Sequence, residues 1–259
     1  MKQIIKSIYI FSFISLLSSC INSKNTENET NNQSIAESDD VDYYKKGVTA
    51  LEEIDYAEAK KMFELAAQDG SAEAMNDLGK LYSEGLGVPK DDSIAFTWYE
   101  KAANKGLAVA QYSMGVSYHF GEGVDEDINK AVDWYRKSAE QGFAPAQYNL
   151  GEAYYFGDGV SKDKQTAYYW YGKSAEQGYA KGEYNLGFAY YNGECVPQNY
   201  DNAFILFMAS AQQGYDKAEY AVGLCYSKGL VVEQNTNLAM EWYKRAAEHG
   251  NKDALKIFQ

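Results

Sequence analysis

The sequence predicts an all-α solenoid in which helical hairpins stack one after another along the chain. Residues 108–142 read AVAQYSMGVSYHFGEGVDEDINKAVDWYRKSAEQG, and residues 144–178 repeat the same glycines, alanines and aromatic pair thirty-six positions later. One central glycine marks the register of five successive units, at positions 79, 115, 151, 187 and 223. A fixed period of this size is typical of stacked supersecondary units, each of which contacts only its neighbours.

The first nineteen residues predict a signal peptide. Lys2 and Lys6 precede the apolar run SIYIFSFISLL at residues 7–17, which is too short to cross a bilayer as a helix. Residues 17–20, Leu-Ser-Ser-Cys, resemble the bacterial lipobox. This resemblance implies that Cys20 becomes a lipidated N-terminus and anchors the chain to a membrane. The alternative is an ordinary secretory peptide in which Cys20 is incidental.

Residues 20–41 predict a disordered acidic tether. Between residues 21 and 42 there are five asparagines, six acids and few apolar side chains, so this stretch cannot bury enough surface to offset the entropy of ordering. As a flexible coil it would span about 25 Å. Ile21 stands where some lipoproteins carry the Asp of inner-membrane retention. We therefore expect a lipid-anchored protein on the periplasmic side of a bacterial envelope, at the outer membrane rather than the inner one.

The first helix of each unit is predicted from an apolar face. In the second unit Ala110, Met114 and Tyr118 recur four residues apart, which places them on one side of a helix. Two glycines end this helix in the first three units and can supply the positive φ of a tight connection. In the last two units Cys195 and Val231 replace the second glycine, so we expect those two loops to take a different local geometry.

The second helix of each unit is predicted from its ends and from an aromatic pair. It begins after an N-cap Asp or Asn, four residues before a small alanine, and stops at a glycine placed as a C′ cap. All four tryptophans precede a tyrosine in the same slot of this helix, which is typical of a packing core. The same pattern divides the folded part into an N-terminal hairpin at 42–70, five repeats at 71–250 and a capping helix at 251–259.

The repeated pattern resembles the SEL-like (Sel-one-like) repeat, a branch of the tetratricopeptide-like superfamily. It reads A-x-x-x-(L/M)-G-x-x-Y-x-x-G-x-G-V-x-x-D-x-x-x-A-x-x-W-Y within residues 72–178, and the resemblance covers residues 42–259. It implies a right-handed α/α superhelix of antiparallel helical hairpins. It also implies a scaffold or adaptor for protein complexes, as in many secreted or periplasmic bacterial members of the family.

A partner-binding surface is predicted on the side of each first helix opposite its buried stripe. At 100° per residue, positions two before, two after and five after the Leu or Met anchor fall about 140° to 200° away from it. From the second unit onward these positions are rich in aromatic residues, which contact surfaces favour. The candidate residues are Tyr112, His119, Tyr148, Tyr155, Tyr184, Phe188, Tyr191 and Tyr220. The alternative for the first tyrosine of each unit is packing against the next such helix.

The sequence carries no catalytic, cofactor-binding or metal-binding signature. Its two histidines, His119 and His249, belong to different units, so neither a His-rich metal site nor a Ser–His–Asp or Cys–His arrangement is expected. Cys195 and Cys225 could pair in an oxidising compartment. Their offset of about 9 Å along the stack, added to the spacing between units, disfavours a bridge.

These observations predict a non-enzymatic, membrane-tethered scaffold that binds a protein or an extended peptide in an acidic, tyrosine-lined concave groove. The formal charge of −13 repels phosphate backbones, so no nucleic acid partner is expected. One rival function is an immunity lipoprotein that neutralises a secreted toxic effector, which the family resemblance permits. Another is a hydrolase of the β-lactamase-like type, against which the missing paired-cysteine pattern of the cysteine-rich relatives argues.

Overall fold

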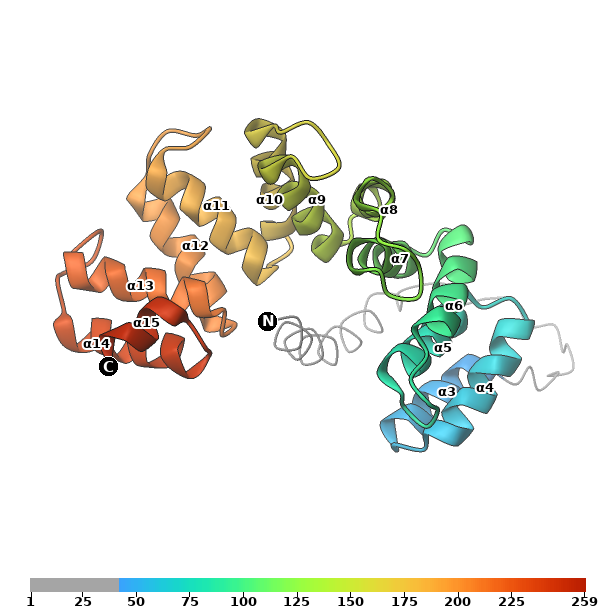
Figure 1. The fold of residues 1–259 in the computed structure, drawn as a ribbon. Coiled ribbons are helices and arrows are strands. Elements are labelled where there is room, and N and C mark those ends of the chain that lie inside the picture. Colours follow the sequence, from blue (N-terminus) through green and yellow to red (C-terminus); the bar gives the residue numbers. More distant parts are fainter. Residues whose placement is uncertain (1–41) are drawn as a thin grey trace, which may run out of the picture. The chain divides into compact units, whose positions relative to one another are not determined.

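The computed structural model describes residues 42–259, which form a unit of their own. The signal peptide at 1–19, the lipidated Cys20 and the tether at 20–41 lie outside the described residues and stay predictions. Within the described part every regular element is a helix. The helices are α3 (Tyr43–Glu52), α4 (Tyr56–Gln68), α5 (Ala72–Glu84), α6 (Asp92–Asn104), α7 (Ala108–Phe120), α8 (Ile128–Glu140), α9 (Ala144–Phe156), α10 (Lys164–Ala175), α11 (Ala180–Asn192), α12 (Tyr200–Gln212), α13 (Asp216–Lys228), α14 (Thr236–Glu248) and α15 (Lys252–Ile257) (Figure 1).

The helices pair into hairpins, and each hairpin packs against the next. Every helix from α3 to α14 contacts the helix that follows it. This nearest-neighbour arrangement confirms the predicted all-α solenoid. Below, helix A denotes the first helix of a repeat (α5, α7, α9, α11 and α13) and helix B the second (α6, α8, α10, α12 and α14). The gap between one helix A and the next is called a step.

Each helix B begins at a polar side chain that caps it, as predicted. The carboxylate of Asp127 accepts a hydrogen bond from the backbone N–H of Lys130 at 3.1 Å, a contact that stabilises a helix by about 1 kcal/mol. Helix A lacks this cap after the first repeat. Its N-cap residues there, which make no side-chain cap hydrogen bond, are Leu107, Phe143, Tyr179 and Tyr215. Packing of these large side chains therefore has to fix where helix A begins.

The central glycine of each repeat lies against an aromatic ring of helix B. A Cβ atom added to Gly151 would meet the ring of Tyr171 at 2.7 Å, and one added to Gly187 would meet Phe207 at 2.9 Å. Both distances are shorter than ordinary van der Waals contact, so only glycine lets the ring approach the helix A backbone this closely. The register glycine is therefore a packing device, and the second residue of each aromatic pair supplies the ring.

A buried serine on helix B ties three of the hairpins internally. The hydroxyl of Ser138 donates to the carbonyl oxygen of Ala108 at 2.6 Å, and Ser174 and Ser210 make the equivalent bond at 2.9 and 2.7 Å. All three serines are fully buried, so little water competes for these bonds. Each bond fixes the register of helix B on helix A.

The loops after α11 and α13 keep the backbone conformation of the glycine loops. Cys195 has φ 60° and Val231 has φ 69°, against 69° for Gly159. The expectation of a different geometry at these two loops is therefore wrong. The reason lies in the backbone bonds that close the connection, since the N–H of Asn199 still donates to the carbonyl of Tyr190 at 2.9 Å as in the glycine loops. Those bonds hold an L-residue in a region that costs about 1–2 kcal/mol.

Both cysteines of the described region are free thiols. Cys195 is exposed, whereas Cys225 is 3% exposed, and burial raises the pKa of the Cys225 thiol to about 11. Cys225 occupies the slot that Ala153 and Ala189 fill in earlier repeats, and all three positions are buried.

Across residues 42–259, no helix combines the length and the apolar character needed to cross a bilayer.

Candidate functional site

The eight predicted partner-binding residues all lie on helices A. Tyr112 and His119 belong to α7, Tyr148 and Tyr155 to α9, Tyr184, Phe188 and Tyr191 to α11, and Tyr220 to α13. The structure places them in three different surroundings.

The first tyrosine of each set packs within the array. Tyr112 is 7% exposed. Its ring lies 5.9 Å from that of Tyr135 in the same hairpin and 5.3 Å from that of Phe143, the residue that precedes α9. Tyr148 and Tyr184 repeat this arrangement one and two repeats later, and burial raises the pKa of both hydroxyls. These rings therefore contact helix B and the start of the next helix A.

His119 and Tyr155 lie half-buried near the end of helix A. The His119 ring lies 4.6 Å from that of Phe120, and desolvation lowers the pKa of His119, so the imidazole is neutral at pH 7. The hydroxyl of Tyr155 lies 3.5 Å from the carboxylate of Glu194. That carboxylate is ion-paired with Lys164, whose hydrogen bond lowers the pKa of Glu194. Tyr155 is thus held by a neighbouring loop.

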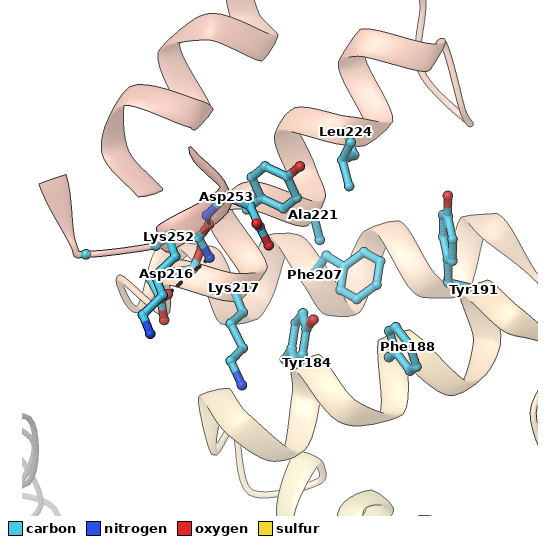
Figure 2. A pocket seen from close by; sticks show the side chains of 13 residues that line it. Tyr184, Phe188, Tyr191, Phe207, Asp216, Lys217, Ala221, Leu224, Lys252 and Asp253 are labelled. Atoms are coloured by element: carbon cyan, nitrogen blue, oxygen red, sulfur yellow. Dashed lines mark hydrogen bonds between the residues drawn. The ribbon is translucent and has the colours of Figure 1, made fainter. Parts of the chain in front are cut away.

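The remaining three candidates line one groove, which the packed Tyr184 borders as well. Tyr184, Phe188, Tyr191 and Tyr220 border a cavity of about 660 Å³ between α11 and α13, a volume within the usual range of ligand pockets. Phe207 of α12 also borders it, and Figure 2 shows side chains of α11 facing Ala221 and Leu224 of α13 across the opening. Phe188 is 40% exposed. We call this cavity the α11–α13 groove. Tyr112, His119, Tyr148 and Tyr155 lie outside it.

Two lysines stand at one end of the α11–α13 groove, beside Asp216 and Asp253 (Figure 2). They are Lys217, on the first turn of α13, and Lys252, which begins α15. Neither has an ion-pair partner among the described residues. The groove therefore combines an aromatic wall with two lysines that form no ion pair, in a chain whose formal charge is −13.

The preceding step, between α9 and α11, is filled by polar side chains. Glu152 accepts a hydrogen bond from Nδ2 of Asn185 at 3.0 Å and another from the hydroxyl of Tyr171. Nζ of Lys181 lies 5.5 Å from the ring centroid of Tyr148. Thirty-six residues further on, the positions of Glu152, Asn185, Tyr171, Lys181 and Tyr148 are taken by Phe188, Ala221, Phe207, Lys217 and Tyr184. The α11–α13 groove thus lacks the carboxylate, the amide and the hydroxyl that bridge the previous step.

Helical periodicity found the aromatic wall of this groove and missed its charged end. Positions opposite the buried stripe of helix A include Phe188 and Tyr191, but Lys217 and Lys252 lie at helix starts, where that angular argument does not apply. A signal was present in the sequence. Aligning the repeats position by position sets Glu152 against Phe188 and Asn185 against Ala221, and both exchanges remove a polar bridge.

The family model described as "Sel1 repeat" matches residues 42–71, 72–107, 108–143, 144–179, 180–215 and 216–251. The chain belongs to the Sel1 repeat family. Six Sel1 repeats thus follow one another in this Sel1 repeat protein, and the N-terminal hairpin is matched as the first of them.

Solved structures share this architecture. A Sel1 repeat protein from Oxalobacter formigenes is 36% identical, with a TM-score of 0.76, over 82% of this chain and 87% of that chain. The protective antigen c5321 of uropathogenic Escherichia coli, which displays an SLR fold, is 36% identical with a TM-score of 0.70 over 81% of this chain, which spans 46% of that one. The immunity protein Pa5087 of Pseudomonas aeruginosa is 23% identical with a TM-score of 0.52 over 81% of each chain, a likeness of fold alone. No curated protein matches the sequence.

The α11–α13 groove offers the chemistry of recognition. Aromatic rings supply rigid, amphipathic contact area, and uncompensated ammonium groups supply specificity for charge. Among residues 42–259 no cluster of three His, Cys, Asp or Glu side chains could hold a metal ion. As a Sel1 repeat solenoid, the protein has the architecture of a protein-protein interaction scaffold.

Proposed function

We propose that this Sel1 repeat protein is a non-enzymatic scaffold that binds a partner protein, or an extended peptide of one, on the surface formed by its helices A. The observation that carries the proposal is the α11–α13 groove, in which four of the eight predicted contact residues border one open cavity of about 660 Å³. A preformed groove on a stacked array binds without a large ordering cost, because its walls are already in place.

The proposal includes attachment to the cell envelope. It is supported by the sequence alone, in which an apolar run of eleven residues ends at Leu-Ser-Ser-Cys20. Acyl chains on Cys20 would anchor the protein stably, and the tether would hold the repeats about 25 Å from the membrane. We place the protein on the periplasmic side, at the outer membrane.

Mass spectrometry of the membrane-extracted chain should show acylated Cys20, and Cys20→Ser should release the protein from the membrane fraction. A Cys20→Ser chain that stays in that fraction would count against a lipid anchor.

A crosslinking pull-down tests the scaffold function. The full chain, the variant Tyr155→Ala/Phe188→Ala/Tyr191→Ala and the control Ile205→Ala are used to capture proteins from envelope extracts. Ile205 is 64% exposed on α12 and does not border the groove. Partners captured by the wild-type and control chains should be lost with the triple variant. If the triple variant keeps its helical circular dichroism and still captures every partner, the proposed binding surface is wrong.

A second candidate function is that of an immunity lipoprotein that neutralises a secreted toxic effector. The observation in its favour is the likeness of fold to the Pseudomonas aeruginosa immunity protein Pa5087. An acidic chain of this kind could cover a basic surface of an enzyme by charge complementarity. Deleting the gene should then make cells sensitive to an effector that they secrete themselves. Deletion without such self-intoxication would argue against this function and leave the scaffold proposal in place.

A further inference from the structure

The acids at the charged end of the α11–α13 groove are engaged, whereas its lysines are not. Oδ1 of Asp253 lies 2.7 Å from Nζ of Lys256, and Oδ2 of Asp216 accepts a hydrogen bond from Nδ2 of Asn251 at 3.1 Å. The two lysines have no carboxylate partner among the described residues. The Asn251 amide is neutral, so Asp216 keeps its charge, whereas Asp253 is paired with Lys256. Two unpaired lysines thus stand against the single charge of Asp216, and the net charge at this end is positive.

Lys217 differs from the equivalent lysine of the previous repeat in having no aromatic ring over its ammonium group. In the previous repeat Lys181 lies over the ring of Tyr148, a contact that partly satisfies an ammonium group. No ring contact of Lys217 is found among the described residues. Tyr184, the counterpart of Tyr148, keeps the equivalent ring contacts and adds one with Phe188. The step that lost its polar bridge thus also carries a lysine that no ring covers.

We propose that the α11–α13 groove binds an extended segment of the partner in which a large apolar side chain is flanked by aspartate or glutamate. The apolar side chain fills the cavity beside Phe188 and Tyr220, and the flanking carboxylate pairs with Lys217 or Lys252. This inference rests on the proposed scaffold function and names the chemistry of the partner segment.

The net charge of the chain does not oppose this assignment. At physiological ionic strength the Debye length is about 8 Å, so charges beyond the groove mostly affect the rate of encounter. Pairing within the groove depends on the charges that border it, where two unpaired lysines stand against Asp216 alone, since Asp253 is already paired with Lys256. A basic segment, drawn by the acidic chain as a whole, is the outcome that would contradict the proposal.

A selection experiment identifies the preferred segment directly from random peptides. A phage library of random eight-residue peptides is selected on the full chain in detergent and on the control Ile205→Ala. We expect both to enrich peptides with Phe, Tyr, Trp or Leu next to Asp or Glu, at least tenfold over the starting library. Enrichment of Lys- or Arg-flanked peptides, or no enrichment, would overturn the proposal.

A matched variant closes the groove with side chains that the molecule already uses. Phe188→Glu/Phe207→Tyr/Ala221→Asn copies the polar bridge of Glu152, Tyr171 and Asn185 from the previous step. Fluorescence polarisation with the enriched peptides, acetylated and amidated so that only side-chain carboxylates remain, should show at least a tenfold loss of affinity. Unchanged affinity in this variant would place the binding elsewhere and overturn the proposal.

A second variant changes only exposed side chains, so it tests the proposal even if the groove-closing variant misfolds. Lys217→Gln/Lys252→Gln alters two exposed side chains and should weaken acidic peptides about fivefold while flattening the salt dependence of their binding. A peptide in which Gln replaces each acid should bind wild type and this variant alike. A free C-terminal carboxylate on that Gln peptide should restore little affinity, and full restoration would overturn the assignment to side-chain carboxylates. Should an envelope partner bind the groove-closing variant as well as wild type, this inference fails while the scaffold function stands.

Discussion

Replacing Gly151 by alanine should destabilise the repeat array, although alanine is the better helix former. The added Cβ would stand 2.7 Å from the ring of Tyr171. That ring cannot retreat easily, because Tyr171 is 2% exposed and its hydroxyl is bonded to Glu152. Overpacking of this kind costs about 1–3 kcal/mol, and the exchange of glycine for alanine returns up to about 1 kcal/mol. We expect a net loss of about 1 kcal/mol in the free energy of unfolding.

Gly172 supplies the matched control, one position beyond Tyr171 on α10. A Cβ added there would meet nothing within 4 Å, so Gly172→Ala should stabilise the array by about 0.5–1 kcal/mol. Urea unfolding followed by circular dichroism measures both variants against the wild-type chain. The two exchanges are chemically identical, so the opposite sign isolates the close contacts of the added Cβ at Gly151.

A double-mutant cycle tests the cause. In a Tyr171→Ala background the ring is gone and the carbonyl oxygen of Ala167, 3.1 Å from the added Cβ, stays, so Gly151→Ala should cost clearly less than it does in the wild-type chain. A Gly151→Ala chain at least as stable as wild type, or a destabilisation that is just as large without the ring, would refute the reasoning.

Three further predictions concern other features of the array. Val231→Gly should raise the urea midpoint, because Val231 has a φ of 69°, which costs an L-residue about 1–2 kcal/mol. This cost exceeds the roughly 0.5–1 kcal/mol by which the greater chain entropy of glycine favours the unfolded state. A lowered midpoint would contradict this. Burial raises the pKa of Asp77 to about 6, so the folded chain holds a proton that the unfolded chain loses above about pH 4. The contribution of Asp77 to the free energy of unfolding therefore falls as pH rises from about 4 to about 6. Over that pH range Asp77→Asn should gain stability relative to wild type. Parallel pH profiles of the two chains would show that Asp77 does not titrate this way. In native Cys20→Ser protein a thiol reagent should label exposed Cys195 promptly and buried Cys225 only on unfolding, and rapid labelling of both would contradict the packing of α13.

The fold could be predicted from the sequence because every repeat carries the same capping residues and the same register glycine. The polar N-caps of helix B and the register glycines appear where predicted, since capping and close ring approach depend on residues within one hairpin. The loops at Cys195 and Val231 were mispredicted for the opposite reason. A single residue there suggests a new conformation, while the backbone bonds of the whole connection impose the old one.

The candidate site was only partly predictable. Helical angles placed Phe188 and Tyr191 on an outward face, yet the same rule selected Tyr112, which is 7% exposed because Tyr135 and Phe143 enclose it. The periodicity of one helix does not show which side chains of the neighbouring elements pack against its outward face. The cavity depends on Ala221, whose short side chain matters only when compared with Asn185 in the neighbouring step.

The contrast between two adjacent steps has a consequence for how such arrays diversify. Glu152, Tyr171 and Asn185 bridge one step, and different residues at the three matching places leave an open cavity at the next step. The glycine and ring that hold each hairpin together are not among the groups that must change. A repeat array can therefore acquire a new surface at a single step by local replacement, while the contacts inside its hairpins stay in place.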